Sequence, residues 1–202
     1  MSCNDKAGDR EDSEDLIIER ADSERKGYGA RVTGYVTRNP LRFESQEISM
    51  KIAIGCDHGG FDLKNRIMPF LKQEGHIVED FGTHSKESCD YPVIGFEVAK
   101  AVTDGKAERG ILICRTGVGM AIIANKLRGI RAAACYDVDI TKSAREHSDC
   151  NILVLAADYT DLERAKEILK IWFRTEHKEE RHMRRVKQIK DIESGLKENK
   201  GK

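Results

Sequence analysis

The chain has 202 residues, 35% of them charged, and its 35 Lys and Arg balance 35 Asp and Glu. This length allows one domain with a sizeable core and some spare chain. A net charge of zero gives no electrostatic reason to propose nucleic acid or an anionic membrane as a partner. The six cysteines are scattered, with no CxxC pair and no Cys/His spacing typical of zinc. We therefore interpret them as reduced thiols and expect no metal site.

Residues 1–49 differ from the rest, because charged residues alternate with Ser, Gly and Thr and no helical or strand period persists. We expect a flexible extension. A weak strand pattern over 28–37 leaves open a small hairpin or docking arm, and Met50, directly before the first strong strand, leaves open a natural start there. The first residues are too polar for a signal or transit peptide and no apolar run could span a membrane, so we expect a cytoplasmic protein.

From Lys51 onward, near-continuous apolar runs alternate with amphipathic segments. The runs are KIAIGC (51–56), HIVEDFG (76–82), GILIC (110–114), RAAACY (131–136) and NILVLAA (151–157). Such runs are typical of strands buried on both faces. Strict alternation of strand and helix predicts an α/β fold, a three-layer αβα sandwich with a Rossmann-like (flavodoxin-like) five-stranded parallel sheet.

Helix boundaries follow from local signals. Gly75, Gly105 and Gly129 stand where helix C-caps belong, whereas Pro69 predicts a kink or early break in the first helix. Two helices follow the fifth strand, and the last, over EERHMRRVKQIKDIESGLKENK, is too charged to bury much of its surface within its own subunit. We expect one domain over 50–193, with this extra C-terminal helix, and a charged tail over 194–202.

The stretch GILICRTGVGM (110–120) combines a strand, a glycine-rich turn and a helix start. Such a turn presents several backbone N–H groups to one point, where the helix dipole adds positive potential, so an anion should bind there. The dinucleotide fingerprint is only half matched, because Ile122 stands where its third glycine should be. A cysteine phosphatase would need an arginine at the position that Met120 occupies. Both of those functions are disfavoured.

Cys114 could be an inert core residue, as most cysteines are. Its place beside a helix start and Arg115 is instead the electropositive setting that makes a thiolate available as nucleophile or base, and we favour this interpretation. Asp57 and His58 follow the first strand, where the ligand crevice of a parallel sheet lies. They could contact substrate hydroxyls or a phosphate, or Asp57 could simply cap the next helix.

Two further candidates lie outside these loops. His147 ends the fourth helix, which places it at the opposite end of the strands unless the end of the helix bends round, and it could be merely a cation favoured at a helix C-terminus. Arg181 and Arg185 are four residues apart on one helix face. They could belong to a solvated face, or form a phosphate clamp supplied to a neighbouring subunit.

The motifs GCDHGGFDLK, EDFGTHSKESCDYP, GILICRTGVGM, ANKLRGIRAA, REHSDCNIL and RHMRRV occur together and in order. With them, the chain from Met50 to about Glu193 resembles the family of ribose-5-phosphate isomerase B and galactose-6-phosphate isomerase. The resemblance implies an aldose–ketose isomerase that converts ribose 5-phosphate to ribulose 5-phosphate, or acts on a close relative, through a cis-enediolate. It implies no metal and no organic cofactor, and a homodimer, with a tetramer left open, whose site is shared between subunits.

The resemblance also assigns residue roles. Cys114 would be the base that moves a proton between C1 and C2, and His147 the acid/base that opens the furanose ring. The remaining substrate contacts would be Asp57, His58, Tyr91, Arg115, Thr116, Gly117, Val118, Gly119, Ser148, Arg181 and Arg185, with the loop over 115–119 holding the enediolate oxygens and the last two arginines holding the phosphate.

Three positions depart from the family pattern. Arg115 replaces a glycine, Ser148 replaces an asparagine, and Asp158 stands where many members have a phosphate-binding arginine. Our hypothesis is that Arg115 compensates for the arginine missing at 158 and that the preferred substrate is a short sugar phosphate other than ribose 5-phosphate. The alternative is a phosphosugar-binding protein of the same fold that has lost catalysis.

Overall fold

The structure is a computed structural model that describes residues 49–195. The expectations for 1–48 and for 196–202 therefore lie outside the described residues. The strands are β1 (Lys51–Cys56), β2 (Ile77–Asp80), β3 (Arg109–Cys114), β4 (Ala132–Ala134) and β5 (Ile152–Ala156). The helices are α1 (Phe61–Gln73), α2 (Tyr91–Thr103), α3 (Val118–Ala124), α4 (Val138–Ser148), α5 (Leu162–Arg174) and α6 (Glu180–Glu193).

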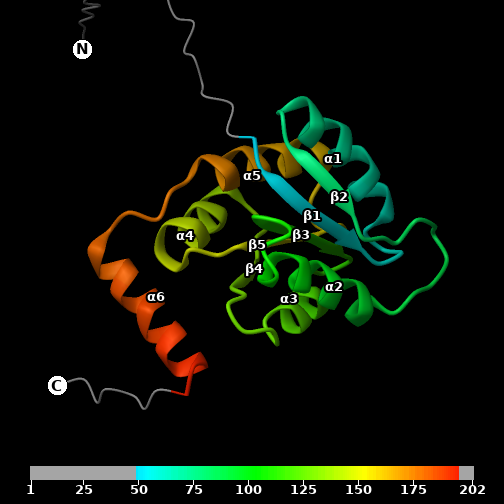
Figure 1. Ribbon diagram of the computed structural model, residues 1–202. Helices are drawn as coiled ribbons and strands as arrows, with labels where there is room; N and C mark the ends of the chain where they lie inside the picture. Colours follow the sequence, from blue (N-terminus) through cyan, green and yellow to red (C-terminus); the bar gives the residue numbers. More distant parts are fainter. Residues whose placement is uncertain (1–48, 196–202) are drawn as a thin grey trace, which may run out of the picture. The chain divides into compact units, whose positions relative to one another are not determined.

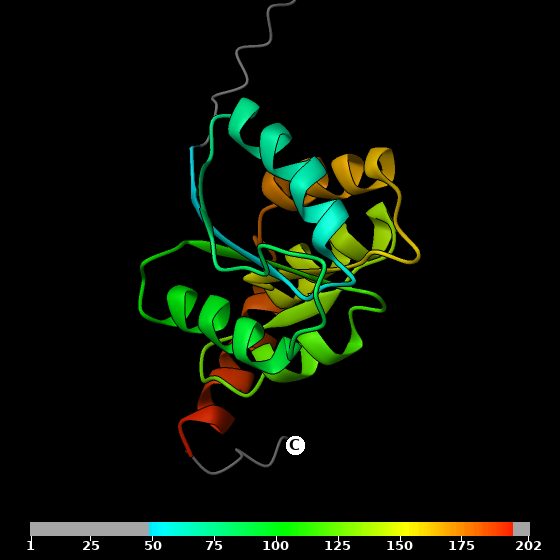
Figure 2. The same ribbon diagram turned by 90° about the vertical axis from the view of Figure 1, so that its right-hand side faces the viewer.

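The five strands form one parallel sheet between two helical layers, which confirms the predicted fold class. Helices α1, α4 and α5 cover one face, and α2 and α3 cover the other (Figure 1; Figure 2). Alternate residues of β1 pack against the two helical layers, because successive side chains of a strand point to opposite faces of the sheet. Ile52 and Ile54 thus join the core under α1 and α5, while Ala53 joins the core under α2.

Helix α5 shows how the sequence builds a layer. Its buried residues Ala165, Ile168, Leu169 and Trp172 recur at three- and four-residue spacing, so they form one apolar stripe against the sheet. Asp161 begins the helix by accepting a hydrogen bond from the backbone N–H of Arg164 (2.9 Å). The helix therefore starts immediately after the loop that follows β5.

The strand order is β2-β1-β3-β5-β4, so β5 lies inside the sheet and β4 at its edge. The flavodoxin order would place the fourth strand inside and the fifth at the edge. Cys114, the last residue of β3, is consequently paired with Ala156, the last residue of β5. The loops after β1, β3 and β5 are thereby neighbours at the carboxyl end of the sheet.

Two local expectations have different outcomes. Gly75 and Gly105 have the positive φ angles (86° and 72°) of helix C-caps, as predicted. The prediction for Gly129 was wrong, because α3 ends at Ala124 and its C-cap is Asn125. The prediction of an early break at Pro69 was wrong, because α1 continues to Gln73. Pro69 cannot donate to the carbonyl of Asn65, but both residues are exposed, so water can satisfy that carbonyl.

Candidate active site

The turn after β1 is drawn tightly against β3. Asp57 Oδ1 accepts hydrogen bonds from the N–H groups of Gly59 (2.9 Å) and Gly60 (3.1 Å). A Cβ on Gly60 would lie 2.7 Å from the carbonyl oxygen of Ile113, so only glycine allows this approach. Asp57 therefore holds the turn with one carboxylate oxygen, which leaves the other oxygen free of this task.

Cys114 ends β3 on the face covered by α2 and α3. Its Sγ accepts a hydrogen bond from the N–H of Gly117 (3.1 Å), and its side chain is only 6% exposed. Gly117 has a φ of 78°, which turns the chain sharply into α3. Because the first bond of α3 runs from Ala121 N–H to Gly117 C=O, the N–H groups of Gly119 and Met120 have no partner inside the helix. Partnerless N–H groups at a helix start favour the binding of a negatively charged ligand.

Three other cysteines are in a different situation. Burial raises the pKa of Cys56 and of Cys135 to about 12 and that of Cys150 to about 11. These thiols remain protonated at neutral pH and are inert core residues. Of the four buried cysteines in residues 49–195, Cys114 alone lies at the glycine-rich turn.

Tyr91 and His58 lie near the loops that follow β3 and β1. A Cβ on Gly119 would lie 2.6 Å from Cζ of Tyr91, so the tyrosine ring, at the first residue of α2, rests on the start of α3. His58 Nδ1 accepts a long hydrogen bond from the N–H of Cys89 (3.4 Å). In a neutral ring this leaves the proton on Nε2, where it can be donated to a ligand.

Arg115 extends from the loop after β3 toward the loop after β5, and its side chain is largely exposed. Its Nε donates to Asp158 Oδ2 (3.0 Å), and a Cβ on Gly59 would be 2.3 Å from its Cγ. The pair joins the loops after β3 and β5 above the loop after β1. Beside it is a hollow of about 530 Å³, lined by Gly59, Asp62, Leu63, Arg66 and residues 157–161.

The backbone around the glycine-rich loop is also fixed. Tyr136, after β4, donates its hydroxyl hydrogen to the carbonyl oxygen of Thr116 (3.3 Å), and Thr116 Oγ1 accepts from the N–H of Val118 (3.4 Å). Thr116 and Val118 are both exposed at the surface. The loop over 115–119 is therefore held from the side of β4 and open toward solvent.

The remaining predicted residues lie at the opposite end of the sheet. His147 and Ser148 end α4, immediately before β5 begins. Since β3 has six residues, its two ends are separated by about 16 Å at roughly 3.3 Å per step. The structure thus confirms that His147 lies at the far end of the strands from Cys114 of its own chain.

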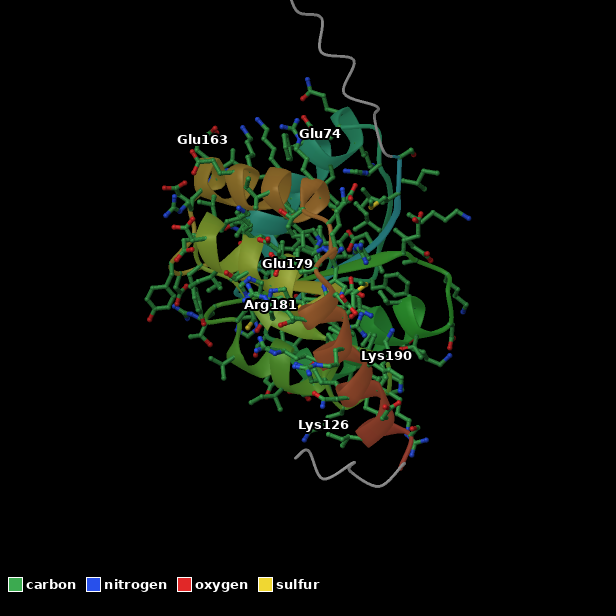
Figure 3. The ribbon with its side chains drawn as sticks, turned by 90° about the vertical axis from the view of Figure 1, so that its left-hand side faces the viewer. Glu74, Lys126, Glu163, Glu179, Arg181 and Lys190 are labelled. Atoms are coloured by element: carbon green, nitrogen blue, oxygen red, sulfur yellow. The ribbon has the colours of Figure 1, made fainter. Side chains whose placement is uncertain are left out.

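Arg181 and Arg185 belong to α6, which crosses that far end. The helix begins beside α4, and its last residue, Glu193, accepts a hydrogen bond from the N–H of Gly129 in the loop before β4 (3.1 Å). Figure 3 shows this path, with Arg181 near the beginning of α6 and Lys190 near its end. The predicted residues therefore form two groups, one at each end of the sheet.

Two features of these groups were not predicted. His182 is buried (2% exposed) and its ring stacks on that of His147 with centroids 4.2 Å apart. The buried Lys64 donates to both carboxylate oxygens of Asp80 (2.6 and 2.8 Å) and to the carbonyl of Thr83 (2.7 Å), which fixes the loop beside the end of β1. The sequence signal for His182 was its place between two arginines of interest; Lys64 gave none.

Within residues 49–195, no group of three or more His, Cys, Asp and Glu side chains is arranged to hold a metal ion. In the same range, each helix is too short or too polar to cross a membrane.

Comparison with known proteins identifies the class. Residues 52–189 match the sequence profile of the Ribose/Galactose Isomerase family, and the chain belongs to this family. Ribose-5-phosphate isomerase B of Escherichia coli (strain K12) is 45% identical over 143 residues, which are 71% of this chain and 96% of that protein. D-erythrulose-4-phosphate isomerase of Pectobacterium atrosepticum is 42% identical over 128 residues, 63% of this chain and 84% of the relative. The solved structure of Clostridium thermocellum ribose-5-phosphate isomerase B superposes with a TM-score of 0.71 at 48% identity and covers 73% of this chain and 100% of its own.

Proposed function

We propose that this protein is a cofactor-free aldose–ketose isomerase acting on a phosphorylated sugar. The observation that supports this most directly is the Cys114 sulfur, which receives the Gly117 N–H (3.1 Å) beside the free N–H groups that begin α3. A base next to a set of donors is what proton transfer alpha to a carbonyl requires.

The reaction follows from this arrangement. The Cys114 thiolate takes the proton from C2 of the open-chain aldose, and the electron pair moves through C1 to the aldehyde oxygen, giving a cis-enediolate. The N–H groups of the loop over 115–119 stabilise this negative charge, each by about 3 kcal/mol. The proton of the O2 hydroxyl moves to O1 of the enediolate, and the thiol then returns its proton to C1, which leaves a ketone at C2 and a hydroxyl at C1. Asp57 and His58 orient the substrate hydroxyls at the same end of the sheet.

We further propose that a second copy of the chain completes the site. Ring opening by His147, with Ser148 beside it, and phosphate binding by Arg181 and Arg185 cannot occur at Cys114 of the same chain, because about 16 Å of strand separate the two groups. A homodimer that places α6 of one copy at the crevice of the other brings them together.

The surface is consistent with such a dimer. Large apolar side chains are exposed on α2 and α3 next to the crevice, and also on α6: Val93, Phe96, Val118, Ile122, Met183, Ile189 and Ile192. The proposed dimer would cover part of this apolar surface. The reduced cysteines fit the cytoplasm, the location we propose.

The substrate we propose is a short sugar phosphate. The two isomerases among the relatives above are named for a five-carbon and a four-carbon sugar phosphate. Arg115 supports the hypothesis of compensation, since its guanidinium neutralises Asp158 and keeps both terminal nitrogens for another anion.

A panel of tetrose, pentose and hexose phosphates, assayed for aldose–ketose interconversion, tests the proposal. The Cys114→Ser variant should lose at least 100-fold in kcat, an estimate of about two orders of magnitude for a removed base, while still binding substrate. Cys135→Ser is the matched control, because it places the same hydroxyl in a buried thiol site in the core on the opposite face of the sheet. Binding without turnover in the unmodified protein would instead support the phosphosugar-binding alternative.

A further inference from the structure

The imidazole of His182 packs face to face on that of His147. The ring centroids are 4.2 Å apart and the planes differ by 17°. His182 is buried by α4 and α6, whereas His147 is exposed on its other side. The buried His182 ring therefore supports one face of the more exposed His147 ring.

The backbone that carries His147 is already rigid. Asp149, with a φ of 45°, ends α4 and accepts hydrogen bonds from Arg145 (2.9 Å) and Arg131 (2.8 Å). Burial would raise the pKa of Asp149, but these arginines outweigh it and hold the pKa below its usual value. With the main chain fixed, the freedom that remains to His147 is rotation of its side chain, and the stack restricts it.

The edge of the His182 ring contacts the beginning of α6. Its Nε2 accepts a hydrogen bond from Arg181 Nε (3.1 Å) and lies 3.2 Å from Glu179 Oε2. Glu179 also accepts from Arg181 Nε (2.7 Å), and Figure 3 shows both residues at this end of the helix. One buried ring thus touches the proposed ring-opening histidine with its face and a proposed phosphate-binding arginine with its edge.

The same surroundings keep His182 neutral. Burial lowers its pKa first, His147, Arg181 and Arg185 lower it further, and Glu179 opposes them. A neutral ring carries no charge that would repel the neighbouring His147 ring, and its Nε2 lone pair remains available to Arg181.

We propose that His182 is a positioning residue that holds the His147 ring and the Arg181 guanidinium in one fixed arrangement. This inference rests on the proposed function, since it concerns the roles assigned there to these two residues. His182 itself touches no substrate. Its face serves ring opening, which affects kcat, and its edge serves phosphate binding, which affects KM.

The chemistry of pentose phosphates separates the two effects from proton transfer. Ribose 5-phosphate is mainly a closed furanose and must be opened, which is the task of His147. Ribulose 5-phosphate is acyclic, because its O5 carries the phosphate and cannot close a five-membered ring on C2. Exchange of its C1 hydrogen with solvent deuterium therefore requires Cys114 but no ring opening.

The experiment compares His182→Phe, His182→Gln and His182→Ala in the full chain, using ribose 5-phosphate conversion and C1 deuterium exchange of saturating ribulose 5-phosphate. Phe keeps the stack and loses the nitrogen, so KM should rise several-fold with kcat within about threefold. Gln keeps an acceptor near the Nε2 position and loses the stack, so kcat should fall about tenfold to 100-fold with a smaller change in KM. Ala should show both effects, yet all three variants should retain deuterium exchange.

Arg184→Ala, on the exposed part of the same helix, is the matched control and should behave as the unmodified protein. Folding and subunit assembly are followed by circular dichroism and size measurement. A folded His182→Ala variant with unchanged kcat and KM overturns the proposal, and so does an equal loss of conversion and exchange, which would indicate a merely structural role. If the unmodified protein converts ribose 5-phosphate but His147→Ala does so equally well, the role of His147 in the proposed function fails, whatever the His182 variants do.

Discussion

The ion pair between Lys64 and Asp80 gives a stability prediction whose size follows from burial. Lys64 extends from α1 and its side chain is 1% exposed, whereas Asp80, at the end of β2, is 21% exposed. Besides Asp80, the ammonium has the carbonyl of Thr83 as a partner, while Asp80 also accepts from the N–H of Gly82 (2.9 Å). Removing Asp80 and removing Lys64 should therefore cost different amounts of folding stability.

Removing the carboxylate leaves a buried ammonium, which costs about 3–5 kcal/mol. At about 2–4 °C per kcal/mol for a chain of this size, Asp80→Asn should lower Tm by roughly 6–20 °C. Lys64→Met leaves a carboxylate that water and Gly82 still reach, so the cost should be smaller, about 1–3 kcal/mol. Asp62→Asn is the matched control, because it breaks a pair with Lys86 whose side chains are 71% and 68% exposed, worth less than about 1 kcal/mol.

Thermal and urea unfolding should be measured at one protein concentration, because dissociation of a dimer makes Tm concentration-dependent. The expected order of destabilisation is Asp80→Asn, then Lys64→Met, then Asp62→Asn. Equal shifts for Asp80→Asn and Asp62→Asn would refute the argument that burial of the ammonium sets the cost. A larger loss for Lys64→Met than for Asp80→Asn would show that the carboxylate is the less well solvated partner.

Three further predictions concern the site and its surroundings. Arg115→Gly should raise KM for the preferred sugar phosphate about tenfold, because it leaves the Asp158 carboxylate unpaired. The change in Tm should be small, because the ion pair is exposed. An unchanged KM for every active substrate would refute the hypothesis that Arg115 compensates for the missing arginine. Gly119→Ala should lower both kcat and folding stability, because the new Cβ would lie 2.6 Å from the Tyr91 ring. Adding Tyr91→Ala should restore folding stability but not kcat. Unaltered stability of the Gly119→Ala variant would contradict the close contact between Gly119 and Tyr91. Burial lowers the pKa of His76, so as pH falls below about 6.5 the unfolded chain binds a proton that the folded chain does not. The free energy of unfolding should therefore decline as pH falls through this range, and His76→Phe should flatten the decline. Urea unfolding at several pH values measures both proteins, and an identical decline in the two would contradict the prediction.

The fold could be read from the sequence because each element has its own periodicity, but the strand order could not. Alternation of strand and helix fixes the parallel sheet and says nothing about whether β4 or β5 lies inside. A weaker signal was present in the sequence, because the residues of β5 (ILVLA) are larger and more apolar than those of β4 (AAA). In the structure, β5 is wholly buried and β4 only partly buried. The more apolar strand occupies the interior, since both of its faces and both of its edges are covered.

The site was predictable in the same uneven way. Asp57, His58 and Cys114 follow buried strands, and parallel strands bring their carboxyl ends to one edge. The contact between Arg115 and Asp158 joins residues 43 positions apart and follows from the pairing of Cys114 with Ala156, which requires the strand order. Sequence analysis could suggest that the two residues compensate, but it could not show that they touch.

Helix α6 connects the assembly of this protein to its proposed chemistry. Within its own chain it packs on α4 through His182 and reaches the loop at Gly129, and its outer surface exposes Met183, Ile189 and Ile192. Because this helix buries so little surface within its own chain, we expect the second copy of the proposed dimer to supply much of its stability. In the proposed dimer, the contact that orders α6 also delivers Arg181 to the neighbouring crevice, so subunit dissociation should abolish turnover before the α/β domain unfolds. Departures at Arg115 and Asp158 lie on the other side of that crevice and can alter substrate choice without weakening the dimer.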